Sequence, residues 1–266
     1  MSNLRKQILS KSLPPIGPSS SIRNYTLIEW NIYFNDKRYI TMDKNTFCLY
    51  SRNTNDNLSP IFWAVLSQAV TNLLQCQCIA IDIRGHEETK TTDENDLSIE
   101  TLTNNVCQIL HNLFNEDNIS SIFLIGHSMG GALAVYIAKE CSSMINALCV
   151  IDVVESSALE SLNSMQCFLS SRSKQFSTQE KAIEYIVRSG QVRNVESACV
   201  SIVGQIQPMI NTPSNETDSS IFPTAYQTYF LSCKSPKLLL LADVDRLDRD
   251  LTVGQMQGKF QMHVVP

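Results

Sequence analysis

Long apolar runs are missing from this 266-residue sequence, since none approaches the ~20 consecutive apolar residues that a membrane-spanning helix needs. The first fifteen residues are basic and polar, without the apolar core of a secretory signal peptide. The net charge of −5 argues against nucleic acid or an anionic membrane surface as the main partner. We therefore expect a protein of the cytoplasm, the nucleus or both, with neither a nucleic-acid nor a membrane partner.

Histidine is scarce, and the cysteines follow no recognisable pattern. Four histidines are dispersed along the chain, and the nine cysteines include no Cys-x-x-Cys motif. Most cysteines lie in apolar segments, which is typical of buried, reduced thiols in a reducing compartment. We expect neither a metal site nor a cofactor.

Apolar residues make up 43% of the chain, enough for the core of one α/β domain with an insertion. Residues 1–22 are rich in Ser, Pro and Lys and are expected to be a disordered tail, followed by one domain over 23–266. Strands are expected at 27–30, 39–40 and 46–50, as an antiparallel edge hairpin, and then at 78–83, 122–125, 147–151, 237–241 and 260–265. Helices are expected at 59–74 and 99–114. This alternation predicts an α/β fold with a mainly parallel sheet, covered by helices on both faces.

The stretch from about 156 to 235 contains no buried strand of this kind. Ser177-Thr178-Gln179-Glu180 matches a capping box, which predicts a helix that ends at Gly190. A second helix is expected over 195–206. The stretch is predicted to be a helical lid inserted before the penultimate strand; the alternative is plain helical packing on the sheet.

The motif Gly126-His127-Ser128-Met129-Gly130 stands between an apolar strand and an amphipathic helix. This setting is typical of a nucleophile elbow, a strained turn that exposes the serine hydroxyl at the carboxyl edge of a sheet. Ser128 is the predicted nucleophile, and the backbone N–H of Met129 is the predicted oxyanion donor. Side chains at Gly126 and Gly130 are expected to clash with neighbouring backbone. The alternative is an ordinary strand-to-helix turn with a surface serine.

A serine nucleophile needs a histidine base and a carboxylate that orients it. Asp152 and Asp245 both follow apolar strands at the correct edge, and the residues alone do not decide between them. Asp243 and Asp248 are weaker candidates for the acid.

No histidine stands where the fold places the base, on the loop after the last strand. The four candidates are His127 beside the serine, His111 within a helix, His86 on an earlier loop and His263 inside the last strand. In addition, the segment between Tyr50 and Pro60 has neither an apolar strand nor a glycine that could supply a second oxyanion donor.

Several stretches resemble one family of α/β-hydrolase serine esterases, the protein phosphatase methylesterases. They are IGHSMGGA (125–132), VIDVVE (150–155), LNSMQCF (162–168), SGQVRNVESA (189–198) and KLLLLADVDRLDRDLTVGQMQGKFQM (237–262), with a weaker match at IDIRGHEETK (81–90). The resemblance implies demethylation of the C-terminal leucine methyl ester of the type 2A protein phosphatase catalytic subunit. The C-terminal tail of that subunit is the implied partner, and no cofactor is implied.

Matched residue by residue, Ser128 corresponds to the family nucleophile and Asp152 to the family acid, which favours Asp152 over Asp245. The family histidine falls beyond the position of Pro266. The family's third strand and its oxyanion loop have no counterpart before 58–65, and the lid is shortened around 220–229. We therefore expect little turnover from this chain. A non-catalytic phosphatase-binding protein and a generic esterase or lipase remain the alternatives.

Without the third strand, a central position in the sheet should be unfilled. Ile79, Ile81 and Ile83 are then expected to be less covered. Whether Thr46–Tyr50 fills that position is left open by the sequence.

Overall fold

A computed structural model of the chain describes residues 24–29, 31, 33–34, 36–53, 63–86, 88–114, 121–153, 173, 175–201, 226–242, 247 and 249–265. The chain divides into two compact units. The first unit comprises residues 1–38, 49–81 and 173–212, and the second comprises 39–48, 82–172 and 213–266. The expected disordered tail, 1–22, lies outside the described residues.

A three-stranded sheet has the order β1-β2-β3, formed by β1 (Asp36–Met42), β2 (Asn45–Asn53) and β3 (Gln77–Ile81). The turn between β1 and β2 contains Asp43, at φ +54°. β2 and β3 run antiparallel, with Leu49 opposite Ile81. The expected strands at 39–40 and 46–50 are thus confirmed and lengthened. The strand expected over 27–30 is absent from described residues 27–29.

Helix α2 (Ala64–Leu73) is tied to β2 through a buried arginine. The Nε of Arg52 donates to Thr71 Oγ1 at 2.5 Å, and its Nη1 donates to the carbonyl of Tyr33 at 2.9 Å. These bonds offset the cost of burying a guanidinium group. The expected start of this helix at 59–62 lies outside the described residues.

Helices α6 (Gln179–Arg188) and α7 (Val195–Ser201) pack together in the first unit. Thr178 caps α6 by accepting from the N–H of Lys181 at 3.3 Å, so the helix begins one residue later than the capping box predicts. Gly190, at φ +75°, ends it as predicted: its N–H donates to Val187 O, and that of Gln191 donates to Ile186 O. The predicted extension of α7 to residue 206 lies outside the described residues.

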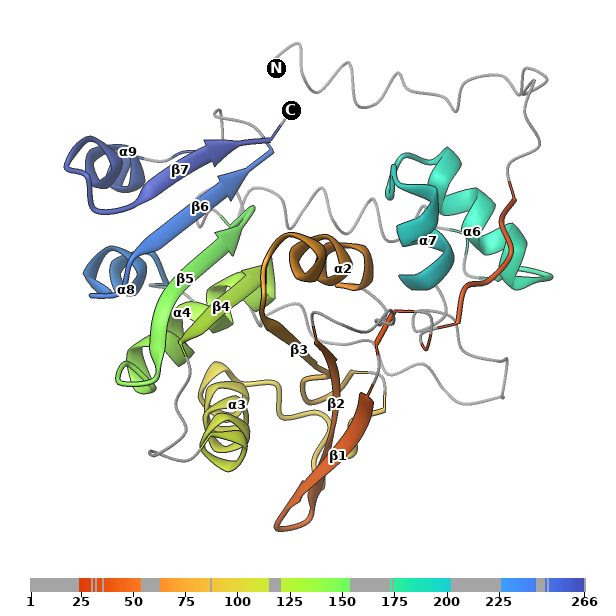
Figure 1. The fold of residues 1–266 in the computed structure, drawn as a ribbon, viewed down its shortest axis with the longest axis horizontal. Helices are drawn as coiled ribbons and strands as arrows, with labels where there is room; N and C mark the ends of the chain where they lie inside the picture. The colour runs from red at the N-terminus through yellow and green to blue at the C-terminus, as the bar shows by residue number, and fades with distance from the viewer. Residues whose placement is uncertain are drawn as a thin grey trace. The chain divides into compact units, whose positions relative to one another are not determined.

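The second unit is built on a parallel sheet with the order β4-β5-β6-β7, whose four arrows lie side by side in Figure 1. Its strands are β4 (Ile122–His127), β5 (Ile145–Ile151), β6 (Lys237–Leu241) and β7 (Gln261–Val264). Its helices are α3 (Ile99–Leu113), α4 (Met129–Glu140), α8 (Tyr226–Ser232) and α9 (Arg249–Met256). The short helices α8 and α9 were not expected from the sequence. The expected strands and α3 are confirmed to within a few residues.

The two faces of this sheet are covered to different degrees. Helix α4 packs on β4 and β5, and Leu148, Val150 and Leu239 are at most 1% exposed. On β4, Phe123 is 69% exposed and Ile125 41%. Alternate residues of a strand point to opposite faces, so the exposed pair belongs to the face opposite the one that carries Leu124 and Gly126.

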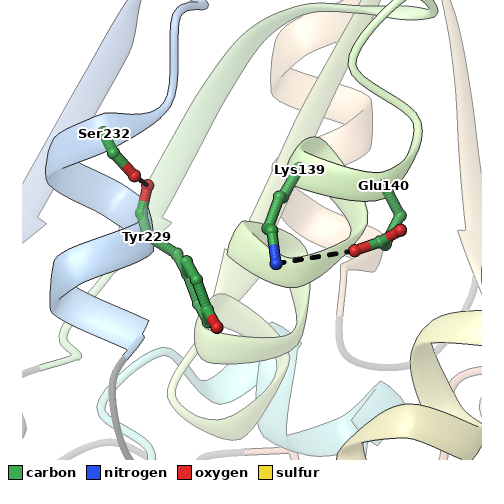
Figure 2. Close-up of polar contacts among 4 residues, drawn as sticks. All are labelled: Lys139, Glu140, Tyr229 and Ser232. Atoms are coloured by element: carbon green, nitrogen blue, oxygen red, sulfur yellow. Dashed lines mark hydrogen bonds and ion pairs between the residues drawn. The ribbon is translucent and has the colours of Figure 1, made fainter.

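Helix α8 packs against α4, and Figure 2 shows Tyr229 of α8 pointing toward α4. The rings of Tyr136 and Tyr229 meet edge to face at 5.1 Å, and Lys139 Nζ lies 4.2 Å from the centre of the Tyr229 ring. Lys139 also pairs with Glu140 at 3.7 Å, and Ser232 Oγ donates to the carbonyl of Tyr229. Helix α8 falls within the predicted lid range, 156–235; the lid itself stays a prediction.

Strands β3 and β4 belong to separate sheets. Among the described strands, none pairs with the outer edge of β4. Residues 46–50 lie within β2, which pairs with β3. Ile79, Ile81 and Ile83 are half-buried. The unfilled position expected in the sheet stays a prediction.

The eight cysteines in the described residues are all free thiols, three of them buried and the others half-buried. Within the same residues, no helix has the length and apolar character to cross a membrane. No group of three or more His, Cys, Asp or Glu side chains there is arranged to hold a metal ion.

Candidate active site

Ser128 occupies a strained turn between β4 and α4. Its backbone lies at φ 51° and ψ −124°, outside the regions that L-residues normally adopt. Its N–H donates to the Ile151 carbonyl at 3.0 Å, and its carbonyl accepts from Gly131 at 2.9 Å and from Ala132 at 3.1 Å. These bonds hold a conformation that costs about 1–3 kcal/mol. The strained turn expected from the motif is therefore present, and Ser128 is half-buried.

Two glycines allow the turn to be this tight. A Cβ on Gly126 would lie 2.1 Å from the Gly130 carbonyl oxygen, and a Cβ on Gly131 would lie 2.5 Å from Val153 Cγ2. A Cβ on Gly130 would meet nothing within 4 Å. The expected clash is thus confirmed at Gly126 and wrong at Gly130, because Gly130 faces open space. Gly131 is the second glycine that the packing requires, and the sequence analysis missed it.

Asp152 follows β5 at the same edge of the sheet as Ser128. His127 and Ile151 are register partners on neighbouring parallel strands, so Ser128 and Asp152 each come one residue after a paired position. Neighbouring strands lie ~4.8 Å apart. Asp152 also has a positive φ, 50°, and its N–H donates to Leu240 O at 2.8 Å, extending the ladder between β5 and β6. The structure thus brings the predicted nucleophile and the predicted acid to adjacent strand ends.

The other acid candidates, Asp243, Asp245 and Asp248, lie outside the described residues.

Met129 is the first residue of α4. The N–H groups in the first turn of a helix have no partner within that helix, and the helix dipole favours negative charge there. The Met129 N–H therefore suits an oxyanion that forms on a group attacked by Ser128. Residues 54–62, where the sequence lacks the second donor, lie outside the described residues.

All four histidines are described, and all four are exposed. His127 is on β4, His111 in the last turn of α3 and His263 on β7. His86 has its Nδ1 3.0 Å from the carbonyl of Arg84 within its own loop. None of them hydrogen-bonds the Ser128 hydroxyl. In the described residues, the turn at Ser128 therefore lies beside Asp152 without a histidine bonded to the serine.

A buried arginine fixes the loop that follows β3, a role that the sequence analysis missed. The Nε of Arg84 donates to Asn105 Oδ1 on α3 at 3.0 Å, and its Nη1 donates to the carbonyl of Asp93. Arg84 is 5% exposed. The only signal for this role in the sequence is an arginine in the short loop directly after an apolar strand.

Residues 57–266 match the model of the alpha/beta hydrolase family. A Caenorhabditis elegans protein named probable protein phosphatase methylesterase 1 is 40% identical, over 99% of this chain and 79% of its own length. The human protein named protein phosphatase methylesterase 1 is 37% identical, over 94% of this chain and 81% of its own.

Solved structures agree in fold. The thioesterase domain of the curacin biosynthetic pathway matches with a TM-score of 0.62 at 18% identity, over 86% of this chain and 92% of its own. An E-2-(acetamidomethylene)succinate hydrolase matches with a TM-score of 0.64 at 16% identity, over 87% and 90%. At these identities the likeness establishes the α/β-hydrolase fold alone.

The alignment with the human protein runs over 317 positions, more than the 266 residues of this chain. The relative therefore has segments, inside the aligned region, that have no counterpart here. This agrees with the expected internal gaps.

Proposed function

Because the chain belongs to the protein phosphatase methylesterase family of the α/β hydrolases, we propose that it is a serine carboxylesterase acting on the C-terminal leucine methyl ester of the type 2A protein phosphatase catalytic subunit. The observation that carries the proposal is the backbone of Ser128, at φ 51° and ψ −124°, one strand away from Asp152. The names and the extent of the relatives support the substrate class.

In the proposed reaction, Ser128 Oγ attacks the ester carbonyl and forms a tetrahedral intermediate. The Met129 N–H donates to the oxyanion, and methanol leaves as the acyl-enzyme forms. Water then hydrolyses the acyl-enzyme and releases the leucine carboxylate. Asp152 has the role of orienting a histidine base and stabilising its charged form.

The 266-residue chain by itself should turn over slowly. None of its four histidines bonds Ser128, and a serine hydrolase without an engaged triad member retains only ~10³–10⁴-fold over water. The missing glycine-rich donor loop should lower the rate by a further ~10²–10³.

The test combines a fluorophosphonate probe with a methyl-ester release assay on a peptide that ends in leucine methyl ester. We expect the probe to label Ser128 only slowly, because no histidine bonds its hydroxyl, and Ser128→Ala to abolish this residual labelling. Exposed Ser142 is the matched control, because Ser142→Ala should leave labelling unchanged. Equal labelling of all three proteins would exclude Ser128 as the nucleophile. Fast methyl-ester release by the 266-residue chain would show that one of its own histidines acts as the base.

A non-catalytic phosphatase-binding protein is the second candidate, favoured by the absence of a histidine bonded to Ser128. It predicts equal affinity of the chain and of Ser128→Ala for the phosphatase catalytic subunit, with no methanol released by either. Hydrolysis of p-nitrophenyl esters without affinity for the phosphatase would instead indicate a generic esterase or lipase.

A further inference from the structure

A cavity of about 560 Å³ lies in the first unit, between the segment 24–28 and helix α7. Leu27 and Ile28 line one side of it, and Val195, Glu196 and Cys199 line the other. In Figure 1, the red segment that contains residues 24–29 passes beside α7. Small-molecule sites are typically clefts of ~300–1,000 Å³ with mostly apolar walls and a few polar groups. The cavity therefore has the size and the lining of a ligand site.

Hydrogen bonds tie the two walls of the cavity together. The Ile28 N–H donates to the Cys199 carbonyl at 3.3 Å, and Cys199 Sγ donates to the Asn24 carbonyl at 4.0 Å. Asn24 Oδ1 accepts from the Thr26 N–H at 3.0 Å, so the segment turns back on itself. Ile28 and Val195 also pack against the buried core that α6 and α7 share. The cavity is thus formed without a ligand, which lowers the cost of binding one.

Of the described side chains that line the cavity, Glu196 alone is charged at neutral pH. The hydroxyl of Tyr33, a residue that is 2% exposed, donates to Glu196 Oε1 at 2.5 Å. Burial and this bond raise the pKa of the Tyr33 hydroxyl above its usual range, so it remains a donor. Glu196 has no other hydrogen bond or ion pair in the described part of the chain, which leaves Oε2 available to a ligand.

The remaining groups at the cavity favour a cationic ligand. Cys199 is 2% exposed, and burial, together with the charge of Glu196, raises the pKa of its thiol, which therefore stays neutral. An anion would face the Glu196 carboxylate without a counter-charge. A neutral apolar molecule would remove water from that carboxylate without replacing its hydrogen bonds. A cation with an apolar body satisfies both the carboxylate and the apolar walls.

We propose that this cavity binds a small organic cation, an amine with an apolar body. The protonated nitrogen donates to Glu196 Oε2, and the apolar body lies against Leu27, Ile28 and Val195. The site is additional to the proposed esterase function. Its test does not involve Ser128, so the two proposals stand or fall separately.

Three probes with the same phenyl body separate the effect of charge from that of apolar fit: phenethylammonium, phenethyl alcohol and hydrocinnamate. Each is titrated into the full chain and followed by calorimetry and by NMR of the side-chain methyl groups. We expect phenethylammonium to bind saturably and to shift the methyl signals of Leu27, Ile28 and Val195. The alcohol should bind about tenfold or more weakly, because it lacks the charge that strengthens a hydrogen bond to a carboxylate, and hydrocinnamate should bind more weakly still.

Glu196→Gln keeps an acceptor for the Tyr33 hydroxyl and removes the charge, so the affinity for phenethylammonium should fall about tenfold or more. Glu29→Gln is the matched control, since Glu29 is an exposed carboxylate one residue after Ile28 and does not line the cavity. Its affinity for phenethylammonium should equal that of the wild type.

The comparison of the three probes on the wild type decides even if Glu196→Gln fails to fold. The proposal is overturned if phenethyl alcohol binds as tightly as phenethylammonium, or if Glu29→Gln weakens binding as much as Glu196→Gln does. It is also overturned if phenethylammonium causes no saturable shift in the methyl signals of Leu27, Ile28 and Val195.

Discussion

Replacing Gly126 with alanine should disrupt the turn at Ser128, whereas the same change at Gly130 should be tolerated. The added Cβ at Gly126 would lie 2.1 Å from the Gly130 oxygen, 2.6 Å from the Gly130 carbonyl carbon and 2.7 Å from Gly131 Cα, and real Cβ atoms essentially never come within 3.0 Å of another atom. All three atoms are backbone in the first turn of α4, so no side-chain rotation relieves the clash. Overpacking typically costs ~1–3 kcal/mol. We expect Gly126→Ala to reach or exceed the top of that range, ~3 kcal/mol.

At an unfolding entropy of ~2.1 cal/mol/K per residue, this loss corresponds to a melting temperature lower by about 5 °C or more. Gly130→Ala should melt within a degree or two of the wild type, or slightly higher, because alanine is favoured over glycine in helices by up to ~1 kcal/mol. Calorimetry gives the melting temperatures, and fluorophosphonate labelling reports the turn in the folded protein. Equal melting and equal labelling of Gly126→Ala and Gly130→Ala would refute the packing described for the elbow.

Three further predictions concern the second unit. Hydrogen bonds from Thr101 and Ser98 hold the pKa of the exposed Asp96 carboxyl below its usual 3.8. The ionised carboxylate therefore contributes stability above pH 3.8, and this contribution is lost as the pH falls through the lowered pKa of the folded state. Thermal melts should therefore show Asp96→Asn less stable than the wild type at pH 7, with the difference shrinking below about pH 4. In urea, Phe123→Ser should change the unfolding free energy by less than ~0.5 kcal/mol, while Leu148→Ala on the covered face should cost ~2–5 kcal/mol; equal losses would contradict the assignment of the two faces. Arg84→Ala removes two hydrogen bonds from a buried charged group and should cost about 3 kcal/mol in the same assay, whereas a loss within ~0.5 kcal/mol would show that the loop after β3 does not depend on it.

The local parts of the site could be predicted because their signals lie within a few residues of each other. An apolar strand, Gly-His-Ser-Met-Gly and a helix together specify the turn at Ser128. Gly190 marks the end of α6 because only a residue that tolerates φ +75° fits there.

Features that depend on distant packing could not be read in this way. The glycine required beside Gly126 is Gly131, because Val153, more than twenty residues later, passes against it. The apolar residues at 27–28 resembled a strand, but Ile28 makes a single backbone bond to Cys199 of α7. Helices α8 and α9 have seven and eight residues, too short for a clear period in the sequence.

The contacts that fix the elbow come from β5, from the first turn of α4 and from Val153. Ser128 bonds to β5 through Ile151, Gly126 is packed against the first turn of α4, and Gly131 is packed against Val153 beyond β5. None of these contacts involves a strand on the open edge of β4. A complete oxyanion hole in this fold also takes an N–H from a glycine-rich loop, for which the sequence between Tyr50 and Pro60 offers no glycine. The placement of Ser128 therefore depends on β5, α4 and Val153, whereas full transition-state stabilisation would also depend on a segment elsewhere in the chain.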